Sequence, residues 1–153
     1  MTTRENRPAF RELTRAECDA LLGRQTVARL ASAVHGRVSI EPIHYVYEDG
    51  WLVGRTAEGS KLAALARNPW VALEVDEVRD TFDWESVVVR GTFYRLRGEG
   101  SAAERESWTR ALRLLRRVAP GALGPDDPAA FRDVLFHVHA DEVTGRAARP
   151  SRA

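Results

Sequence analysis

The chain has 153 residues, of which 44% are hydrophobic and 29% are charged, and its net charge is +1. This composition is typical of a single globular domain and excludes an intrinsically disordered chain. The small net charge excludes a general electrostatic attraction to nucleic acid or to anionic membranes, and no apolar run approaches the roughly 20 residues that cross a bilayer.

The first predicted element is a helix that begins after Leu13. Thr14 and Glu17 have the spacing of a capping box, in which each side chain accepts a hydrogen bond from the backbone of the other residue. Cys18 lies within this helix, and as the single cysteine it forms no internal disulfide. We expect residues 1–12 to be a disordered or extended arm. Because this polar arm lacks the apolar core of a signal peptide, we also expect a cytoplasmic protein.

Two strands are predicted next, from Thr26 to Val34 and from Val38 to Tyr47. Pro42 cannot donate a hydrogen bond to a neighbouring strand, so the second strand should be broken, bulged or at a sheet edge near its middle. Such irregularity leaves backbone groups available to a ligand. His44, among apolar neighbours, fits either a hydrogen-bonded core histidine or a haem or substrate contact.

The segment 54–61 has the composition of a phosphate site. It follows a predicted strand, Trp51 to Val53, and precedes a predicted helix, and it combines two glycines with the cations Arg55 and Lys61 and the hydroxyls of Thr56 and Ser60. Lys61 is the only lysine among 23 basic residues, which favours a position that requires a compact ammonium group. The alternative is an ordinary turn and helix cap with a solvated lysine.

The remaining pattern alternates strands and one long helix. The short helix ends at Arg67, before Asn68-Pro69, and Val71–Val75 is a predicted strand. We expect residues 76–83 to be an acidic connection, and residues 86–96 to be the longest strand, bent at Gly91. A helix over residues 104–118, a strand over residues 134–143 and a polar tail over residues 144–153 complete the chain. Residues 13–143 thus form one mainly β domain with peripheral helices, most simply a small antiparallel barrel.

One further cluster has metal-ligand chemistry. His137, His139 and Asp141 alternate along the last predicted strand, so their side chains share one face. The same alternation is typical of an ordinary solvent-facing strand, and we predict no metal site.

Several short motifs occur in an order that resembles a known family. They are Leu22-Gly23-Arg24, Ala28-Arg29-Leu30-Ala31, Pro42-Ile43-His44-Tyr45, Gly59-Ser60-Lys61, Arg67-Asn68-Pro69 and the segment from Trp84 to Gly91. Together they resemble the pyridoxamine 5'-phosphate oxidase-like split-barrel proteins, and most nearly the small flavin-nucleotide-binding branch that includes the nitroimidazole-resistance reductases. The resemblance implies a six-stranded antiparallel split β-barrel with Greek-key connections, a homodimer, and FMN bound between the protomers.

The resemblance also implies roles for particular residues. Arg55 and Lys61 match the positions that neutralise the FMN phosphate, and Thr56 and Ser60 match its hydroxyl donors. The backbone of the strand Pro42, Ile43, His44, Tyr45 matches the one that lies along the flavin ring. Trp84 and Ser86 match residues that approach the cofactor from the partner protomer.

This sequence departs from two branches of the family at recognisable positions, which limits the function that the resemblance implies. The resistance-type proteins carry a histidine near the position of Arg55, and the basic pocket that grips substrate phosphate in the vitamin oxidases is not recognisable. We therefore expect an FMN-dependent oxidoreductase that passes electrons from NAD(P)H to a nitroaromatic or quinone-like acceptor. The protein supplies position and charge to the flavin in such enzymes, so no catalytic side chain is assigned. Because related branches bind deazaflavin F420 or haem, the alternative is a non-catalytic flavin- or haem-binding storage or sensor module.

Overall fold

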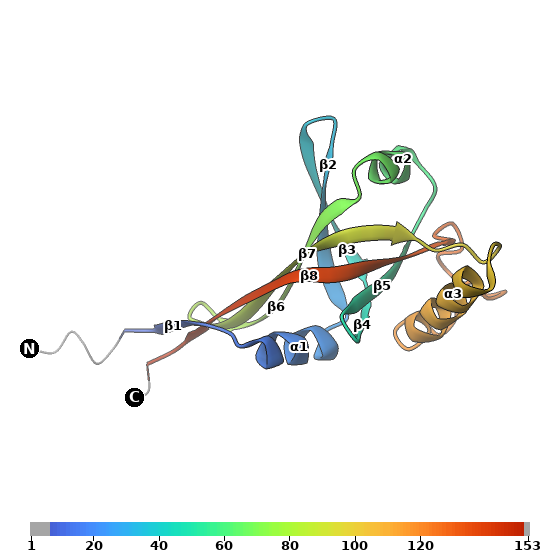
Figure 1. Ribbon diagram of the computed structural model, residues 1–153. Helices are drawn as coiled ribbons and strands as arrows, with labels where there is room; N and C mark the ends of the chain where they lie inside the picture. Colours follow the sequence, from blue (N-terminus) through green and yellow to red (C-terminus); the bar gives the residue numbers. More distant parts are fainter. Residues whose placement is uncertain (1–6, 152–153) are drawn as a thin grey trace, which may run out of the picture.

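The computed structural model describes residues 7–151, which form a strongly twisted antiparallel sheet with three helices around it (Figure 1). The helices are α1 (Arg15–Arg24), α2 (Ser60–Arg67) and α3 (Ala102–Leu115). The strands are β1 (Ala9–Glu12), β2 (Val27–Val34), β3 (Arg37–His44), β4 (Val46–Glu48), β5 (Trp51–Thr56), β6 (Trp70–Asp80), β7 (Asp83–Arg95) and β8 (Val134–Arg149). The expected mainly β architecture is confirmed.

Capping residues set where two of the helices begin. Thr14 accepts a hydrogen bond from the Glu17 backbone N–H, and the Glu17 carboxylate accepts one from the Thr14 backbone N–H, so the predicted capping box of α1 is confirmed. Ser101 and Glu104 form the same arrangement at α3. Because Ser101 satisfies the first amides, α3 begins earlier than the sequence pattern suggested.

The sheet has eight strands where six were expected. Their order is β3-β2-β6-β7-β8-β5-β4, with β1 added along β8. The single strand predicted from Val38 to Tyr47 is divided into β3 and β4 at Tyr45, whose N–H bonds to the Thr26 carbonyl. Since β3 pairs with β2 and β4 pairs with β5, the chain itself joins the two ends of the strand order at Tyr45. The break therefore lies at Tyr45 and not at Pro42, which stays paired opposite Arg29 in the edge strand β3.

The acidic segment after Val75 is a hairpin and not the connection predicted from its composition. Strand β6 continues to Asp80 and β7 begins at Asp83, with a register shift beside the turn. Ion pairs offset the acidic charges: Asp76 pairs with Arg29, Glu77 with Arg24 and Asp83 with Arg79. With their charges paired, these residues are compatible with a strand.

The expected polar tail is also largely a strand. Strand β8 continues to Arg149, where it pairs with β1 on one side and with β7 on the other. Residues 9–12 of the expected N-terminal arm form β1, which lies beside the last residues of β8 at one end of the sheet (Figure 1). The expectations for residues 1–6 and 152–153 lie outside the described residues.

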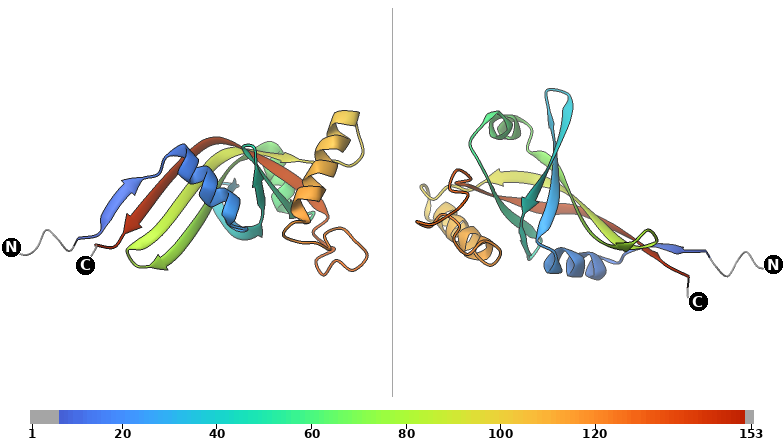
Figure 2. Two further views of the ribbon diagram at one scale, coloured as in Figure 1. Left: turned by 90° about the horizontal axis from the view of Figure 1, so that it is seen from below. Right: turned by 180° about the vertical axis from the view of Figure 1, so that it is seen from behind.

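Two apolar clusters hold the layers together. The larger one lies inside the curled sheet and includes Leu21 and Leu22 from α1, both fully buried. The smaller one lies beneath α3 and includes Leu114, Leu115 and Leu135. Figure 2 shows α3 near the end of the sheet where β8 begins, with α1 towards the opposite end. The N-terminus of α2 follows shortly after the end of β5, and Lys61 in its first turn contacts Glu41 of the edge strand β3.

Candidate functional site

The loop that joins β5 to α2 contains the predicted phosphate residues. Thr56 is the last residue of β5, and Ser60 and Lys61 open α2. Gly59 precedes the helix in an extended conformation, and no side chain caps the first turn of α2, in contrast to α1 and α3. The first amides of α2 therefore lack a side-chain acceptor, and these N–H groups are the donors that an anion uses at a helix start.

Lys61 has an unusual environment for a lysine. Its Nζ is buried and forms an ion pair with the Glu41 carboxylate of β3. Burial lowers the pKa of the Lys61 ammonium, and the nearby positive charge of Arg132 lowers it further. An ammonium group held this way gains most from a ligand that supplies negative charge and hydrogen-bond acceptors.

Arg55 is engaged by another part of the chain. Its guanidinium donates to both carboxylate oxygens of Asp127, at 2.5 and 3.2 Å, and the Asp127 side chain is fully buried. Asp127 also accepts hydrogen bonds from the N–H groups of Leu123 and Ala129. The Arg55 hydrogen bonds, followed by these backbone donors, hold the pKa of Asp127 well below its usual range. Arg55 thus fixes the loop after α3, and its contact with a phosphate stays a prediction.

The two predicted hydroxyl donors remain available. Thr56 is half-buried and Ser60 is exposed, and neither hydroxyl has a hydrogen-bond partner among residues 7–151. The structure thus brings Thr56, Ser60 and Lys61 together at one corner, with Arg55 directed away toward Asp127. It supplies two hydroxyls, the first amides of a helix and one ammonium group to that corner.

The strand predicted to lie along a flavin ring presents two different faces. Ile43 and Tyr45 are buried, and the Tyr45 hydroxyl donates to the Leu22 carbonyl at 2.7 Å. Burial raises the pKa of Tyr45 well above its usual value. Pro42 and His44 lie on the exposed face, so the interpretation of His44 as a core histidine is wrong. On this strand, Pro42 and His44 are therefore the residues whose side chains a ligand can reach.

Trp84 and Ser86 lie elsewhere in the protomer. Both belong to the hairpin end of β7, where Ser86 Oγ donates to Glu74 at 2.8 Å and Trp84 packs near Phe10. The α2 helix instead borders the opposite end of β7, near Phe93, whose N–H bonds to Pro69. At about 3.3 Å per strand residue, the seven residues from Ser86 to Phe93 span roughly 20 Å. One protomer alone therefore does not bring Trp84 or Ser86 to the β5–α2 loop.

The histidines of β8 form an aromatic cluster on the outer face of the sheet. His137 stacks on Trp51 with ring centroids 4.0 Å apart, and His139 Nδ1 lies 2.5 Å from an Asp141 carboxylate oxygen. Within residues 7–151, no three histidine, cysteine or acidic side chains come together as metal ligands. The His137 ring is half-buried and contacts the rings of Trp51 and Tyr94.

Sequence reasoning missed several residues around the β5–α2 loop. Glu41 and Arg132 set the charge around Lys61, and Asp127 holds Arg55. Arg95 and Arg97 border a cavity beside α2. Asp127 follows a Gly-Pro-Asp turn, but no local pattern connects a turn to a residue 72 positions away.

Comparison with known proteins identifies the family and the relatives that this chain resembles. The family model described as pyridoxamine 5'-phosphate oxidase matches residues 14–147. The uncharacterized protein RA0666 of Rhizobium meliloti (strain 1021) is 32% identical over 143 residues, which is 90% of this chain and 95% of that protein.

Two solved structures similar to this chain are FAD-binding proteins. A FAD-binding protein from Mesorhizobium loti is 27% identical, with a TM-score of 0.74 and coverage of 93% of this chain and 98% of that one. The FAD-binding protein from Mycobacterium smegmatis is 26% identical, with a TM-score of 0.60 and coverage of 90% and 97%. Among the described residues, no helix is long and apolar enough to cross a membrane.

Proposed function

The chain belongs to the pyridoxamine 5'-phosphate oxidase family, and on this premise we propose that it is a flavin-nucleotide-binding oxidoreductase. The observation that carries the proposal is the buried Lys61 ammonium group, which lies at the uncapped start of α2 and is paired with the partly exposed Glu41 carboxylate of β3. The ribityl phosphate of a flavin would compete with Glu41 for this ammonium group, and its oxygens would also accept hydrogen bonds from the first N–H groups of α2.

The residues present fit a flavin phosphate. Lys61 would neutralise part of its charge, Thr56 and Ser60 would donate hydroxyl hydrogen bonds, and the first N–H groups of α2 would complete the set. The backbone of residues 42–45 would lie along the flavin ring, as the family resemblance implies. A bound flavin supplies the redox chemistry, taking electrons from NADH or NADPH and passing them to a small nitroaromatic or quinone-like acceptor. Both FMN and FAD carry the phosphate that this corner would bind.

A homodimer is part of this proposal. Val38 and Ile40, on the same face of β3 as Pro42, are 81% and 67% exposed. Exposed aliphatic side chains in a row on an edge strand favour a protein–protein contact. A partner covering this face would also supply its own Trp84 and Ser86, which a single protomer leaves far from the β5–α2 loop.

The test uses the purified full chain. We expect FMN or FAD to bind in calorimetric titrations with a dissociation constant in the micromolar range or below, and NADH or NADPH to bleach the visible absorbance of the bound flavin without oxygen. Flavin binding without bleaching by either nucleotide would limit the protein to a storage or sensing role. If neither flavin binds, the proposal is wrong, and a Soret band after addition of haem would point to the haem-binding alternative.

A further inference from the structure

A groove lies between helix α3 and the outer face of the sheet. Its larger part is a cavity of about 320 Å³ between the first turns of α3 and the end of β7. A smaller cavity of about 170 Å³ lies between α3 and β5. Ser107 of α3 and His137 of β8 line both cavities, so the two adjoin at these residues. The larger cavity falls within the range of about 300–1,000 Å³ that is usual for sites of small organic ligands.

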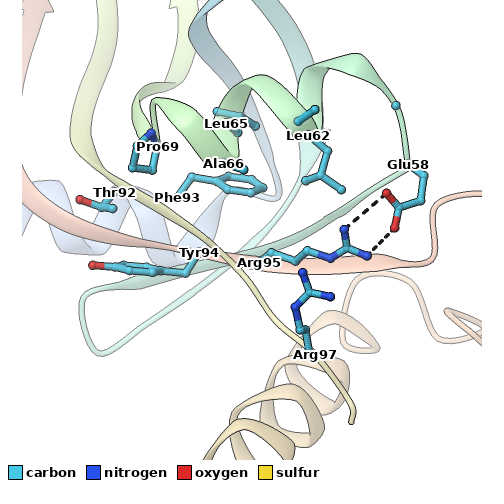
Figure 3. Close-up of a pocket in the computed structure, with 12 residues that line it drawn as sticks. Glu58, Leu62, Leu65, Ala66, Pro69, Thr92, Phe93, Tyr94, Arg95 and Arg97 are labelled. Atoms are coloured by element: carbon cyan, nitrogen blue, oxygen red, sulfur yellow. Dashed lines mark hydrogen bonds and ion pairs between the residues drawn. The ribbon is translucent and has the colours of Figure 1, made fainter. Parts of the chain in front are cut away.

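This groove is separate from the corner where the flavin phosphate is proposed to bind. Figure 3 shows that Phe93 points from β7 toward α2, whereas Tyr94 lies on the other side of the strand. There the Tyr94 ring contacts the rings of Trp51 and His137, with centroids 6.1 and 5.6 Å away. None of the residues 56–61 lines either cavity. A ligand in the groove therefore does not use the proposed phosphate donors.

Aromatic side chains form the sheet side of the groove. Tyr94 is 47% exposed, so a large part of it is available to a ligand. The neighbouring His137 ring stacks on Trp51, with centroids 4.0 Å apart, which fixes its orientation. Across the groove, α3 contributes the small side chains of Ala103 and Ser107. A flat ring can therefore pack against an aromatic surface without a bulky side chain opposing it.

The larger cavity has one guanidinium group that is not engaged. Arg97 lines this cavity and has no ion-pair or hydrogen-bond partner within residues 7–151. The adjacent Arg95, whose guanidinium lies near that of Arg97 in Figure 3, pairs with Glu58. The Glu104 carboxylate, which also lines the cavity, accepts a hydrogen bond from the backbone N–H of Ser101. Because a single free guanidinium matches one negative charge and binds a planar carboxylate through two parallel hydrogen bonds, a carboxylate is the anion that fits Arg97.

Polar groups without partners lie where the two cavities meet. The Ser107 hydroxyl and the ring nitrogens of His137 make no hydrogen bond within the part of the chain that the structure describes. Arg97 lines the larger cavity but not the smaller one, so Ser107 and His137 lie on the β5 side of it. A hydroxyl and a neutral imidazole can each donate and accept a hydrogen bond. A ligand with a hydroxyl group opposite its carboxylate can therefore bind at both ends of the cavity.

We propose that this groove is a second ligand site, which binds a hydroxylated aromatic carboxylate. The carboxylate contacts Arg97, the ring packs on Tyr94, and the hydroxyl group reaches Ser107 and His137. The inference goes beyond the proposed function, because this site shares none of the residues 56–61 and requires no flavin.

The experiment titrates 4-hydroxybenzoate into the full-length, ¹⁵N-labelled protein and follows the backbone amide signals by NMR. We expect a dissociation constant of about 1 mM or below, with the largest shift changes at residues 94–97, 103–107 and 137. Three related probes separate the contributions to binding. Benzoate lacks the hydroxyl, 4-hydroxybenzyl alcohol lacks the charge, and cyclohexanecarboxylate lacks the aromatic ring, so each should bind at least about threefold more weakly.

Two exposed positions test the assigned contacts. Arg97→Ala should weaken binding of 4-hydroxybenzoate by about tenfold or more and remove its advantage over 4-hydroxybenzyl alcohol. Tyr94→Leu keeps an apolar side chain and should remove the advantage over cyclohexanecarboxylate. Arg113→Ala, an exposed arginine on α3 outside both cavities, is the matched control and should change none of these affinities. Because Arg97 and Tyr94 are exposed, both variants should fold.

The outcomes separate this inference from the proposed function. It is wrong if 4-hydroxybenzoate gives no saturable shift change up to about 10 mM, or if 4-hydroxybenzyl alcohol binds the wild-type protein equally well. Saturating FMN should leave the affinity for 4-hydroxybenzoate unchanged, and displacement by FMN would show that the groove belongs to the flavin site. A protein that binds 4-hydroxybenzoate in the groove but binds no flavin would support this inference while the proposed function fails.

Discussion

Arg55 on β5 donates two side-chain hydrogen bonds to Asp127, which lies 72 residues later in the chain. Asp127 in turn accepts from two backbone N–H groups of its own loop, so one buried carboxylate organises the segment between α3 and β8. This segment also carries Arg132, whose charge acts on Lys61. The Arg55–Asp127 pair therefore connects the barrel to the loop that borders the candidate phosphate site.

Asp127→Asn should lower the thermal midpoint by more than about 3 °C, because it removes the charge that Arg55 and the two amides stabilise. Asp126→Asn changes the neighbouring exposed residue and is the control. Since the Asp127 pKa is lowered in the folded state, its contribution to stability is present above the usual aspartate pKa and is lost as the pH falls below it. Thermal melts of both variants at neutral and acidic pH would test this, and equal midpoints at neutral pH would contradict it.

Gly91→Ala should destabilise the protein severely. A Cβ at this position would lie 1.7 Å from the His139 carbonyl oxygen, where β7 and β8 change register. Because the obstacle is backbone, the strands would have to separate, at a cost of about 3 kcal/mol or more in the free energy of unfolding. Urea denaturation measures this cost. Gly23→Ala meets nothing within 4 Å and should leave the stability nearly unchanged.

Lys61→Ala should weaken FMN and FAD binding by about ten- to a hundredfold, corresponding to roughly 1.5–3 kcal/mol for a charged hydrogen bond to phosphate. Calorimetric titration measures the change for both nucleotides. An effect smaller than twofold would remove Lys61 from the phosphate site. Arg113→Ala serves again as the control for a lost surface cation.

Glu41→Gln should change the affinity in the opposite direction. The Glu41 carboxylate lies against the Lys61 ammonium group, so an incoming phosphate competes with it. Neutralising a partly exposed carboxylate of this kind should tighten flavin binding by about two- to fivefold. Glu142→Gln, on the exposed face of β8, is the control. A weaker affinity in Glu41→Gln would mean that Glu41 positions Lys61 and does not compete with the ligand.

The free energy of unfolding should decrease in mild acid because His137 is held neutral in the folded protein. Burial lowers its pKa to about 4, and the charges of His139 and Arg110 act in the same direction. The unfolded chain, with an ordinary histidine pKa, therefore binds a proton that the folded chain does not, so stability falls as the pH drops from about 6.5 toward 4. After allowance for solvent screening, this contribution is about 1–2 kcal/mol. Urea denaturation of His137→Gln should show a flatter pH dependence, whereas His35→Asn, in an exposed turn, should retain the wild-type slope.

Charge on the exposed face of β3 should disrupt the proposed homodimer. Ile40→Glu should reduce the mass measured by sedimentation from twice to once the 17.1 kDa of a single chain. Phe131→Glu, which alters an equally exposed residue on a different surface, should sediment as the wild-type protein does. A wild-type protein that is monomeric at all concentrations would contradict the dimer proposal directly.

The confirmed sequence predictions share a local physical basis. The capping box of Thr14 and Glu17 and the short α2 helix before Asn68-Pro69 each depend on residues within about one helical turn. Local hydrogen bonds and backbone restrictions act whatever the rest of the chain does. The order of the motifs was sufficient to identify the family before the three-dimensional arrangement was considered.

Several other features depended on contacts between distant parts of the chain. The acidic residues after Val75 form a hairpin because arginines from other elements offset their charges, and residues 144–149 form a strand because β1 and β7 lie on either side of them. Arg55 and Lys61 look equivalent in the sequence, but the fold brings a buried aspartate to Arg55 and a partly exposed glutamate, Glu41, to Lys61. Composition alone determined which residues could hold a phosphate, and the tertiary structure decided which of them remain available, because the competing partners lie far away along the chain.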